Sequence, residues 1–339
     1  MSDSSSSPLW VRSPEVQINL NLPFARRYAE VPDSILQMGR HLLDVLADDI
    51  PQKARALAPL VRLRTANRFH AEALALARHV GSSWQEITVA NIVYDLVLSA
   101  FGCSTIALPG PDGPVIARNM DWAPETVLAR CSCLMTYQKH GVTKFINAGW
   151  PGAIGVVTGL SARGFAIVLN AVRCEEPFQR FGYPVLLHLR RVLEDATDFD
   201  HALQLLSHQK LTTGALITLV GTENHQRVCI ERSPTRFALR WPETGGVLVT
   251  TNDYRKLFEP LIHDNAEIFR TTCSRFDHLT RFFADHVAGQ PVKDEKLLYV
   301  LTDPGVIQGI TAQHIILHPT SGSVRLFVPT RLLAADASR

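Results

Sequence analysis

Several features that mark large classes of proteins are missing from this sequence. No segment approaches the roughly 20 apolar residues that a transmembrane helix needs. The start, MSDSSSSPLW, is polar and rich in serine, and it has neither the basic stretch nor the apolar run of a secretory signal peptide. Internal repeats and linker-like runs are also absent. We therefore expect a cytoplasmic protein built as one large domain or two moderate ones.

Charge and cysteine are both scarce. Charged residues make up 19% of the chain and the formal net charge is +2, which gives no electrostatic basis for a nucleic-acid partner. The six cysteines form no Cys-x-x-Cys pair, so a reducing compartment fits better than a disulfide framework. Cys131 and Cys133 would share one face of a strand, where we interpret them as packing residues. His314 and His318 lie too far apart along a strand to bind one ion, and we expect neither a metal nor another cofactor.

The chain is 46% hydrophobic, which is enough for a sizeable core, and its apolar residues follow alternating blocks of helical and strand periodicity. The order of the blocks predicts an α+β fold. Residues 1–7 are expected to be disordered. Helical patterns cover residues 33–47, 53–80 with a break near Pro59, 83–99, 183–193, 199–208, 271–287 and 297–301. Strand patterns cover residues 14–23, 134–137, 144–147, 154–160, 164–170, 215–220, 227–232, 237–241, 246–254, 314–318 and 323–328.

The most informative stretch spans residues 101–122, FGCSTIALPGPDGPVIARNMDW. Residues 103–108 are apolar and partly β-branched, whereas the next six residues are a dense turn signal of proline, glycine and aspartate. An apolar run then returns, which predicts a hairpin. Because a hairpin brings its two ends together, we expect the Cys103 thiol to lie near the Arg118 guanidinium and the Asp121 carboxylate.

That combination suits nucleophilic catalysis. A thiol attacks as the thiolate, and a nearby cation lowers its pKa. Cleavage of the peptide bond before Cys103 would also give this residue a free α-amine, whose pKa of about 7.7–8.0 suits a general base at neutral pH. The alternative is structural, because a free cysteine is among the most commonly buried residues and the polar run after the second strand can form a turn. Residue types alone leave both interpretations open.

The hairpin resembles the nucleophile hairpin of the acid ceramidase and N-acylethanolamine acid amidase family, a group of N-terminal-nucleophile (Ntn) cysteine hydrolases related to penicillin V acylase and bile salt hydrolase. The matching runs are Cys103-Ser104-Thr105-Ile106 and Ala117-Arg118-Asn119-Met120-Asp121-Trp122. The opening strand, with its Leu22-Pro23 step, and the run Asn91-Ile92-Val93-Tyr94-Asp95 are also similar to family segments.

This resemblance implies a fold and a division of the chain. The implied fold is a four-layer αββα sandwich preceded by an N-terminal helical segment. Self-cleavage between Gly102 and Cys103 would separate residues 1–102 from the catalytic residues 103–339 and give an α/β heterodimer.

The resemblance also implies roles for individual side chains. Cys103 would be the nucleophile, with its own amine as the base, and Arg118 would hold the thiolate or the acyl carbonyl. Asp121 would orient the α-ammonium. Asn252, at the end of the predicted strand 246–254, would donate a hydrogen bond to the oxyanion.

Three further residues are candidates for contact with the substrate. Arg270 and Arg275 both fit a later arginine of the family site, with Arg275 slightly favoured, and Trp122 ends the hairpin motif. The implied function is an autoprocessing amidase that hydrolyses N-acyl amides, with fatty-acyl groups favoured, through a thioester on Cys103. Its partner would be a small N-acyl amide, and the apolar faces of the N-terminal helices suggest peripheral contact with a membrane or lipid aggregate.

One departure from the family pattern keeps other functions open. Ala171 stands where the family has a glutamate, and Glu175 or Glu176 would replace it only if the following loop curls back. This prompts the alternative of an acyl-ligand-binding homologue without turnover. A specificity like that of penicillin V acylase or bile salt hydrolase is a second alternative. The thirteen histidines suggest a third, an uncleaved Cys–His hydrolase.

Overall fold

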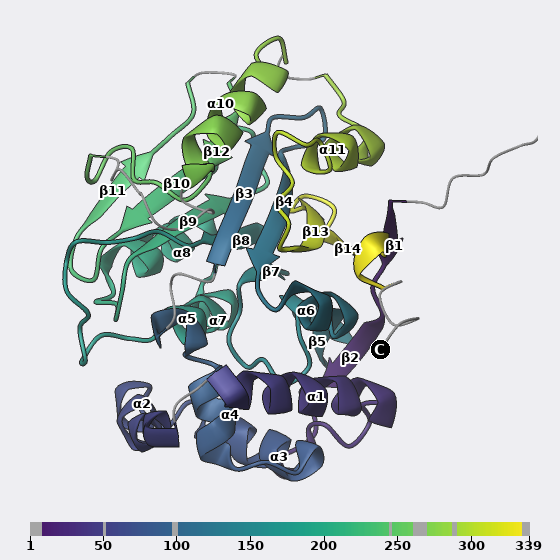
Figure 1. Ribbon diagram of the computed structural model, residues 1–339, viewed down its shortest axis with the longest axis vertical. Coiled ribbons are helices and arrows are strands. Elements are labelled where there is room, and N and C mark those ends of the chain that lie inside the picture. The colour runs from purple at the N-terminus through teal and green to yellow at the C-terminus, as the bar shows by residue number, and fades with distance from the viewer. Residues whose placement is uncertain are drawn as a thin grey trace, which may run out of the picture.

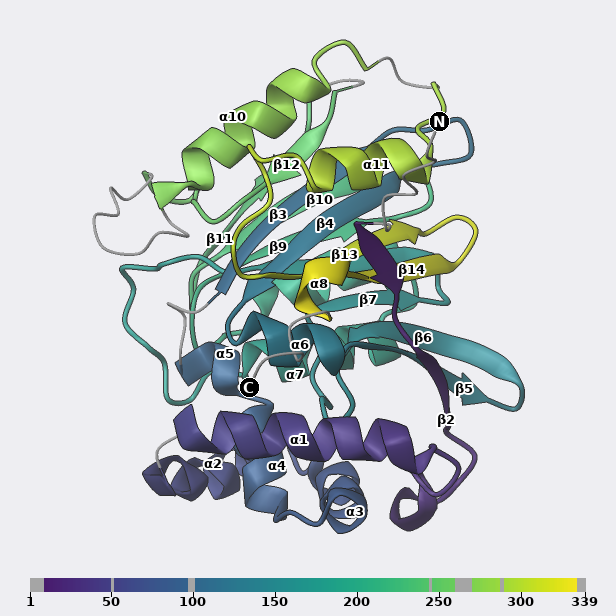
Figure 2. The same cartoon turned by 45° about the vertical axis from the view of Figure 1, so that its right-hand side comes forward.

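The computed structural model describes residues 9–49, 52–96, 101–243, 246–259, 270–286 and 290–333. Two stacked β-sheets form its centre, and helices cover them (Figure 1, Figure 2). The strands are β1 Trp10–Arg12, β2 Glu15–Asn19, β3 Phe101–Leu108, β4 Val115–Trp122, β5 Cys133–Lys139, β6 Val142–Gly149, β7 Thr158–Ser161, β8 Phe165–Asn170, β9 Ala215–Val220, β10 Arg227–Arg232, β11 Phe237–Arg240, β12 Leu248–Thr250, β13 Thr311–His318 and β14 Ser323–Pro329. The expected disorder of residues 1–7 falls outside the described residues.

The α-helices are α1 Asp33–Asp49, α2 Ala58–Arg64, α3 His70–Val80, α4 Trp84–Ala90, α5 Val93–Leu96, α6 Glu125–Arg130, α7 Val185–Asp195, α8 Phe199–His208, α10 Thr272–Phe282 and α11 Asp294–Leu301. Short 3₁₀ helices are η1 Phe24–Arg26, η2 Gln52–Leu57 and η4 Thr330–Leu332. Among the described residues, none of these helices has both the length and the apolar character needed to cross a bilayer.

The two sheets differ in size. The smaller one has six strands in the order β1-β14-β13-β4-β3-β12, and every neighbouring pair is antiparallel. The larger one has eight strands in the order β11-β10-β9-β8-β7-β6-β5-β2, and only its β2–β5 pair is parallel. α10 and α11 cover the outer face of the smaller sheet, whereas α7 and α8 cover that of the larger sheet. The expected αββα sandwich is therefore confirmed.

Both faces of the central strands β3 and β4 are buried, because one faces the larger sheet and the other faces α10 and α11. Ala107 and Ile116 belong to the core between the sheets. Ile106 and Ala117, one position along each strand, pack with Leu279 and other residues of the helical layer. Burial of both faces explains why residues 106–108 and 115–117, at the turn end of the hairpin, are all apolar.

The N-terminal segment is built into the sandwich. β1 pairs with β14 in the smaller sheet, and β2 pairs with β5 in the larger one. α1 to α4 lie together at one end of the sheets, at the bottom of Figure 1. The apolar faces that suggested membrane contact contribute buried residues to the main core, among them Leu42, Leu46, Leu76 and Ile87.

A buried ion cluster joins these helices to α7. Glu72 of α3 accepts a hydrogen bond from the Tyr28 hydroxyl at 2.8 Å and contacts the Arg190 guanidinium at 3.4 Å. Arg190 has no exposed side-chain surface, and its Nε donates to Glu194 at 2.7 Å. Breaking such a buried pair leaves an uncompensated charge, so the N-terminal helices are held firmly against the larger sheet.

Some predicted boundaries are wrong for identifiable reasons. The predicted stretch 53–80 changes from the 3₁₀ helix η2 to α2 beside Pro59, as expected, but it is also interrupted at residues 65–69, where Ala66 and Asn67 have φ of 48° and 62°. Pro59 sits in the first turn of α2, where its missing N–H costs nothing. The predicted helix 83–99 is interrupted after Ala90, and its residues 97–99 lie outside the described part of the chain. Two predicted strands are shorter than expected, since β7 and β12 begin at residues 158 and 248.

Residue types explain several local features. Gly81 ends α3 in the left-handed conformation, with φ of 65°. Asp198 caps α8 by accepting from the backbone N–H of His201 at 2.8 Å. Cys131 follows α6 and does not share a strand with Cys133, but both cysteines are buried, as a packing role requires.

Asp95, at the end of α5, is a buried carboxyl group that links this helix to α7. Its Oδ1 accepts from the backbone N–H of Val185 at 3.1 Å and from the Thr212 hydroxyl. Burial raises the pKa of Asp95 from an ordinary 3.8 to about 7, although both hydrogen bonds favour the carboxylate.

Asp95 should make the protein less stable as the pH rises. Between about pH 4 and about pH 7 the folded protein holds a proton that the unfolded chain has released, so the free energy of unfolding falls with increasing pH. We expect the thermal midpoint of the parent to fall more between about pH 5 and about pH 8 than that of Asp95→Asn, which keeps the acceptor oxygen without the charge. The same pH dependence in both proteins would contradict this assignment.

Candidate active site

The register of the β3–β4 hairpin determines which side chains meet. Cys103 pairs with Met120, and Thr105 pairs with Arg118. Paired residues share a face of the sheet, and so do alternate residues of a strand. Because Ala107 faces the larger sheet, Cys103, Arg118 and Met120 also point into the space between the sheets.

The predicted meeting of thiol and guanidinium is present. Nη2 of Arg118 lies 2.6 Å from Sγ of Cys103, and Nη1 donates to Oγ1 of Thr158 at 2.7 Å. Sγ also lies 3.7 Å from the Leu169 carbonyl oxygen of β8 and 3.7 Å from Sδ of Met120. The thiol is therefore enclosed by strands of both sheets.

Burial sets the protonation state of the Cys103 thiol. Loss of solvation raises its pKa above the ordinary 9.0, and the nearby Arg118 charge opposes that shift without reversing it. In the intact chain the group is thus a neutral thiol at neutral pH, and a base is needed before it can act as a nucleophile.

Two side chains from other segments hydrogen-bond to the backbone of Cys103. Its N–H donates to Oδ1 of Asn252 at 3.2 Å, and its carbonyl oxygen accepts from Nη1 of Arg275 at 2.6 Å. Arg275 also bonds Oδ1 of Asn252 at 2.8 Å and Oγ of Ser104 at 2.8 Å. Asn252 reaches this position because it follows β12, which pairs with β3 up to Thr105.

The structure distinguishes the two candidate arginines. Arg275, on α10, is 1% exposed and contacts both Cys103 and Asn252. Arg270 is exposed to solvent. The geometry thus favours Arg275 as the arginine of the site.

Asn252 has one amide hydrogen engaged already. Its Nδ2 donates to the Ala171 carbonyl oxygen at 2.8 Å, which leaves its second N–H for another acceptor. The loop after Ala171 does not return a carboxylate to this position. Glu175 is exposed, and Glu176 accepts from the Thr235 hydroxyl at 2.7 Å.

Asp121 lies opposite Gly102 in the hairpin, on the face toward α10 and α11. Its Oδ1 accepts from the Thr311 hydroxyl at 2.6 Å. Its Oδ2 is buried and has no hydrogen-bond partner among the described residues. Burial raises the pKa of Asp121, whereas the Arg275 and Arg118 charges oppose that shift.

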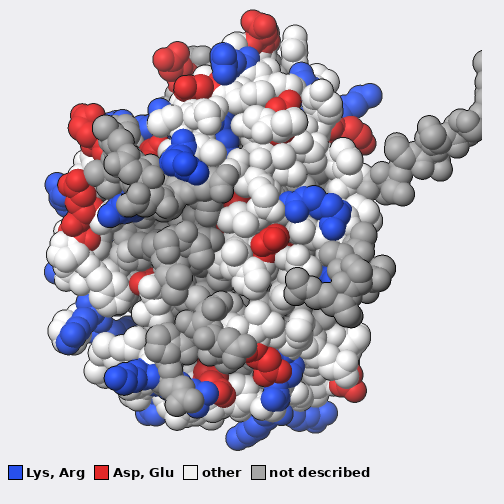
Figure 3. All heavy atoms as spheres, viewed as in Figure 1, with Lys and Arg blue, Asp and Glu red and all other residues white. Residues whose placement is uncertain are grey.

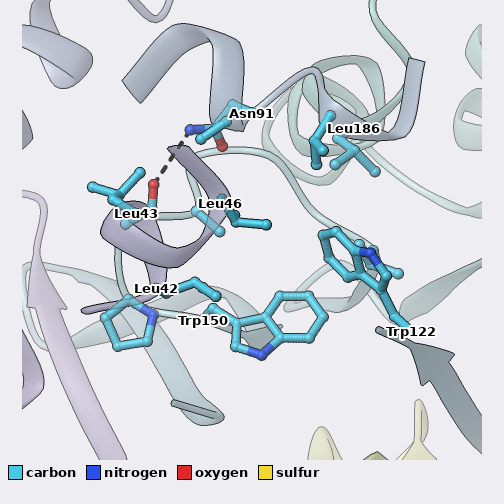
Figure 4. A pocket seen from close by; sticks show the side chains of 13 residues that line it. Leu42, Leu43, Leu46, Asn91, Trp122, Trp150 and Leu186 are labelled. Atoms are coloured by element: carbon cyan, nitrogen blue, oxygen red, sulfur yellow. Dashed lines mark hydrogen bonds between the residues drawn. The ribbon is translucent and has the colours of Figure 1, made fainter. Parts of the chain in front are cut away.

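A small apolar cavity lies next to Trp122, the last residue of β4. Trp122 and Trp150 meet edge to face at 5.2 Å on one side of it, and side chains of α1 close the other side (Figure 4). Its volume is about 40 Å³. Val157, which also lines it, accepts from the backbone N–H of Leu169, whose own carbonyl faces the Cys103 thiol. Trp122 lies two positions along β4 from Met120, which contacts the Cys103 thiol, and therefore faces the same space between the sheets.

Two alternative chemistries gain no geometric support. No group of three or more histidine, cysteine, aspartate or glutamate residues in the described part of the chain is arranged to hold a metal ion. Nδ1 of His314 bonds Oδ1 of Asn119 at 2.7 Å, and Nε2 of His318 bonds Asp294 at 3.0 Å. Within the same residues no histidine hydrogen-bonds to Sγ of Cys103, as a Cys–His hydrolase requires.

Comparison with known proteins places the chain in a family. The family model described as acyl-coenzyme A:6-aminopenicillanic acid acyl-transferase matches residues 108–299, which is more than half of the chain. The chain belongs to this family. The match includes Arg118, Asp121, Asn252 and Arg275, and it begins five residues after Cys103.

Individual relatives of this family member are distant. The chain is 23% identical over 237 residues to the N-acylethanolamine-hydrolyzing acid amidase of Caenorhabditis elegans, an alignment that covers 64% of this chain and 66% of that protein. It is 23% identical over 251 residues to the acid ceramidase of Balaenoptera acutorostrata scammoni, covering 63% of this chain and 61% of the relative. The chain thus spans less than two thirds of the length of these curated relatives. The resemblance inferred from the hairpin is confirmed.

A solved structure supports the fold of the acyl-transferase family member. The Caenorhabditis elegans N-acylethanolamine-hydrolyzing acid amidase ortholog superposes with a TM-score of 0.53 at 17% sequence identity, covering 64% of this chain and 93% of that one. At this identity the comparison bears on the fold alone.

Sequence reasoning missed several groups around the thiol. Met120 contacts Sγ of Cys103, and the pairing of residues across a six-residue loop would have placed it there. Thr158, the Leu169 carbonyl and the Ala171 carbonyl come from strands far along the chain. No local pattern indicates that these strands would stack against the hairpin.

The contrast between Arg275 and Arg270 gives a test of the site's structural role. Arg275→Gln should lower the free energy of unfolding by about 2 kcal/mol or more, because it leaves buried acceptors on Cys103, Ser104 and Asn252 without their donor. Arg270→Gln should change it by less than about 0.5 kcal/mol, as expected at an exposed position. Denaturant unfolding measures both, and equal losses in the two variants would refute the assignment.

Proposed function

We propose that this protein is an autoprocessing N-terminal-cysteine amidase that hydrolyses N-acyl amides through a thioester on Cys103. The observation that carries the proposal is the way this residue is held. Its thiol contacts Arg118, while its N–H and carbonyl bond Asn252 and Arg275. Any buried backbone N–H and carbonyl need partners, but here both partners are side chains of distant segments and the thiol also contacts a guanidinium. Packing alone does not require this arrangement.

The first step is self-cleavage. Sγ of Cys103 attacks the Gly102 carbonyl carbon, a C–S bond forms, the C–N bond to Cys103 breaks, and the thiol proton passes to the departing nitrogen. Water then hydrolyses the thioester and leaves a carboxylate on Gly102 and a free amine and thiol on Cys103. The orphan Oδ2 of Asp121, across the hairpin from Gly102, is available to accept from the α-ammonium that cleavage creates.

The same groups serve turnover. The free α-amine takes the thiol proton as Sγ attacks the amide carbonyl and later gives it to the leaving amine, after which water hydrolyses the acyl thioester. The second amide N–H of Asn252 is available to the negative charge that develops on the carbonyl oxygen. The mechanism draws on no metal or cofactor.

The two fragments would stay together as a heterodimer. Cleavage would leave Tyr28 and Glu72 on one fragment and Arg190 and Glu194 on the other, so the buried ion cluster would cross the fragment boundary. β1 and β2 would still pair with strands of the larger fragment. Separating the fragments would expose core residues and would leave a buried charge without its partner.

The apolar cavity next to Trp122 supports an apolar acyl group on the substrate. Its lining residues are apolar apart from Asn91, which favours a hydrocarbon or aromatic group over a charged one (Figure 4). Two relatives, an N-acylethanolamine-hydrolyzing acid amidase and an acid ceramidase, are named for activity on N-acyl amides, and within this class we favour fatty-acyl groups. Charged side chains of both signs are scattered over the face of the molecule drawn in Figure 3. Peripheral membrane contact and a cytoplasmic location stay predictions.

Two alternatives differ from this proposal in measurable ways. A penicillin V acylase-like or bile-salt-hydrolase-like enzyme would prefer phenoxyacetyl or cholyl amides to fatty-acyl ethanolamides. The acyl-ligand-binding homologue, prompted by Ala171, would hydrolyse none of them. Turnover of the three amide classes by the purified protein therefore separates the three functions.

We predict that the purified protein consists of fragments of 102 and 237 residues, the second being the remainder of 339 residues. Cys103→Ala should abolish both cleavage and amide hydrolysis, because it removes the nucleophile of both steps. Mass spectrometry of the intact protein and an amidase assay measure the two outcomes. Serine substitutions at Cys131, Cys133, Cys174 and Cys273 are the matched controls and should keep both activities. A full-length protein that still hydrolyses amides would rule out the mechanism.

We predict that Asn252→Ala lowers kcat by about 10²–10³-fold, or roughly 2.7–4 kcal/mol, while KM changes little. The reason is that its hydrogen bond to the oxyanion forms only as the carbonyl carbon becomes tetrahedral. Steady-state kinetics with the preferred amide tests this, with circular dichroism as the check on folding. A kcat within about threefold of the parent would remove Asn252 from the site.

A further inference from the structure

Glu231, on β10, is a buried carboxylate that no step of the proposed mechanism uses. Its side chain has no exposed surface. A charge in such a place is costly unless it is paired and fully hydrogen-bonded. The hydrogen-bond partners of Glu231 therefore indicate which part of the structure this carboxylate stabilises.

One group of partners is three consecutive backbone N–H groups of the loop that follows Asn252. The N–H of Arg255 lies 3.1 Å from both carboxylate oxygens, and those of Lys256 and Leu257 donate to Oε2 at 2.8 and 2.9 Å. Successive N–H groups of this kind form a concave anion-binding nest. Here the nest is filled by a side chain of the chain itself, which fixes the loop beginning three residues after Asn252.

The other partner is Arg240 of β11. Its Nε donates to Oε1 of Glu231 at 3.1 Å, and its Nη1 donates to the Val249 carbonyl of β12 at 2.9 Å. Nη2 also lies 3.4 Å from Oγ1 of Thr250. Arg240 therefore holds the chain just before Asn252, and Glu231 holds it just after.

This arrangement meets a specific need of β12. The strand has only three residues and lies at the edge of the smaller sheet, so just one neighbour, β3, fixes it through a ladder. Arg240, in the larger sheet, bonds Val249 and Thr250 of β12, and Glu231 of the same sheet bonds Arg240 and the loop after Asn252. Oxyanion stabilisation depends on donors fixed before the reaction, and a misplacement of about 1 Å costs orders of magnitude in rate.

We propose that the Glu231–Arg240 pair is a positioning device for Asn252, acting on catalysis only through that residue. The inference rests on the proposed function, because it assigns Asn252 the oxyanion role. Glu231 itself bonds the loop and Arg240 and does not contact Cys103. Its removal should therefore impair the same step that Asn252→Ala impairs.

The test is a double-mutant cycle on the amide hydrolysis of the processed protein. Glu231→Gln keeps the side-chain shape, but its amide nitrogen cannot accept from the three N–H groups. We expect kcat to fall about tenfold or more with KM within about threefold of the parent. In the Asn252→Ala background the same substitution should lower kcat by less than about twofold, because the donor that it misplaces is already gone.

Arg227→Gln is the matched control. Arg227 is a buried residue of the same strand that donates to the Ala107 and Gly246 carbonyls, toward the other end of β3 and β12. Its loss should destabilise the protein but affect kcat equally in both backgrounds. Arg240→Met is made in parallel with Glu231→Gln and should show the same dependence on Asn252, so the folded one of the two variants decides.

The outcomes separate the inference from the function on which it rests. A parent protein without amide hydrolysis counts against the proposed function. An active parent in which Glu231→Gln keeps kcat within about twofold overturns the positioning role. Equal losses in the parent and Asn252→Ala backgrounds also overturn it, because they would mean that Glu231 supports the fold generally and not Asn252 in particular.

Discussion

The arrangement of the site depends on the pairing of β3 with β4. A shift of this register by one residue would move Arg118 to the opposite face of the sheet from Cys103, because side chains alternate along a strand. The register is held on both sides, since β12 pairs with β3 and β13 pairs with β4. Both faces of the hairpin are also packed into core, so a slipped register would bury polar side chains against apolar ones. The strand pairing and the core packing of the sandwich therefore fix the contact between the Cys103 thiol and the Arg118 guanidinium.

Burying charged side chains around Cys103 has an electrostatic cost, which their hydrogen bonds and mutual charge interactions must offset. Arg118, Asp121 and Arg275 are all nearly inaccessible to solvent and lie close to the Cys103 thiol. Loss of solvation lowers the pKa of Arg275, although the Asp121 charge opposes the shift. Arg118 donates to neutral acceptors, among them the Thr158 hydroxyl and the Asn119 carbonyl, and its Nη2 lies 2.6 Å from Sγ of Cys103. A guanidinium in this position favours the anionic form of the thiol, as a nucleophile requires.

Much of the hairpin could be predicted from the sequence, because its information is local. The turn residues lie between two apolar runs, and the ends of a hairpin must meet, so the proximity of Cys103 and Arg118 followed from spacing alone. Asn252 and Arg275 lie 149 and 172 residues after Cys103 in the chain. Only the family resemblance could therefore place them in the same site before the structure was known. The choice between Arg275 and Arg270 depended on where α10 begins, because Arg275 lies within this helix and is buried whereas Arg270 precedes it and is exposed. Residue types near the start of the helix do not decide this. Glu231 was missed altogether, because its partners are backbone N–H groups and any residue type can supply them.

The position of the proposed scissile bond within β3 limits what cleavage can change. Gly102 pairs with Asp121 and Cys103 pairs with Met120, so the strand is continuous across the junction. Cutting it would leave both new ends in the sheet, with the sandwich around them unaltered. A new α-ammonium would then arise in a site that solvent does not reach, and it would need acceptors already in place. Oδ1 of Asn252 accepts from that nitrogen in the intact chain, and Oδ2 of Asp121 is an unfilled acceptor on the neighbouring strand. The intact chain thus already contains the hydrogen-bond acceptors that the α-ammonium of the cleaved chain would need.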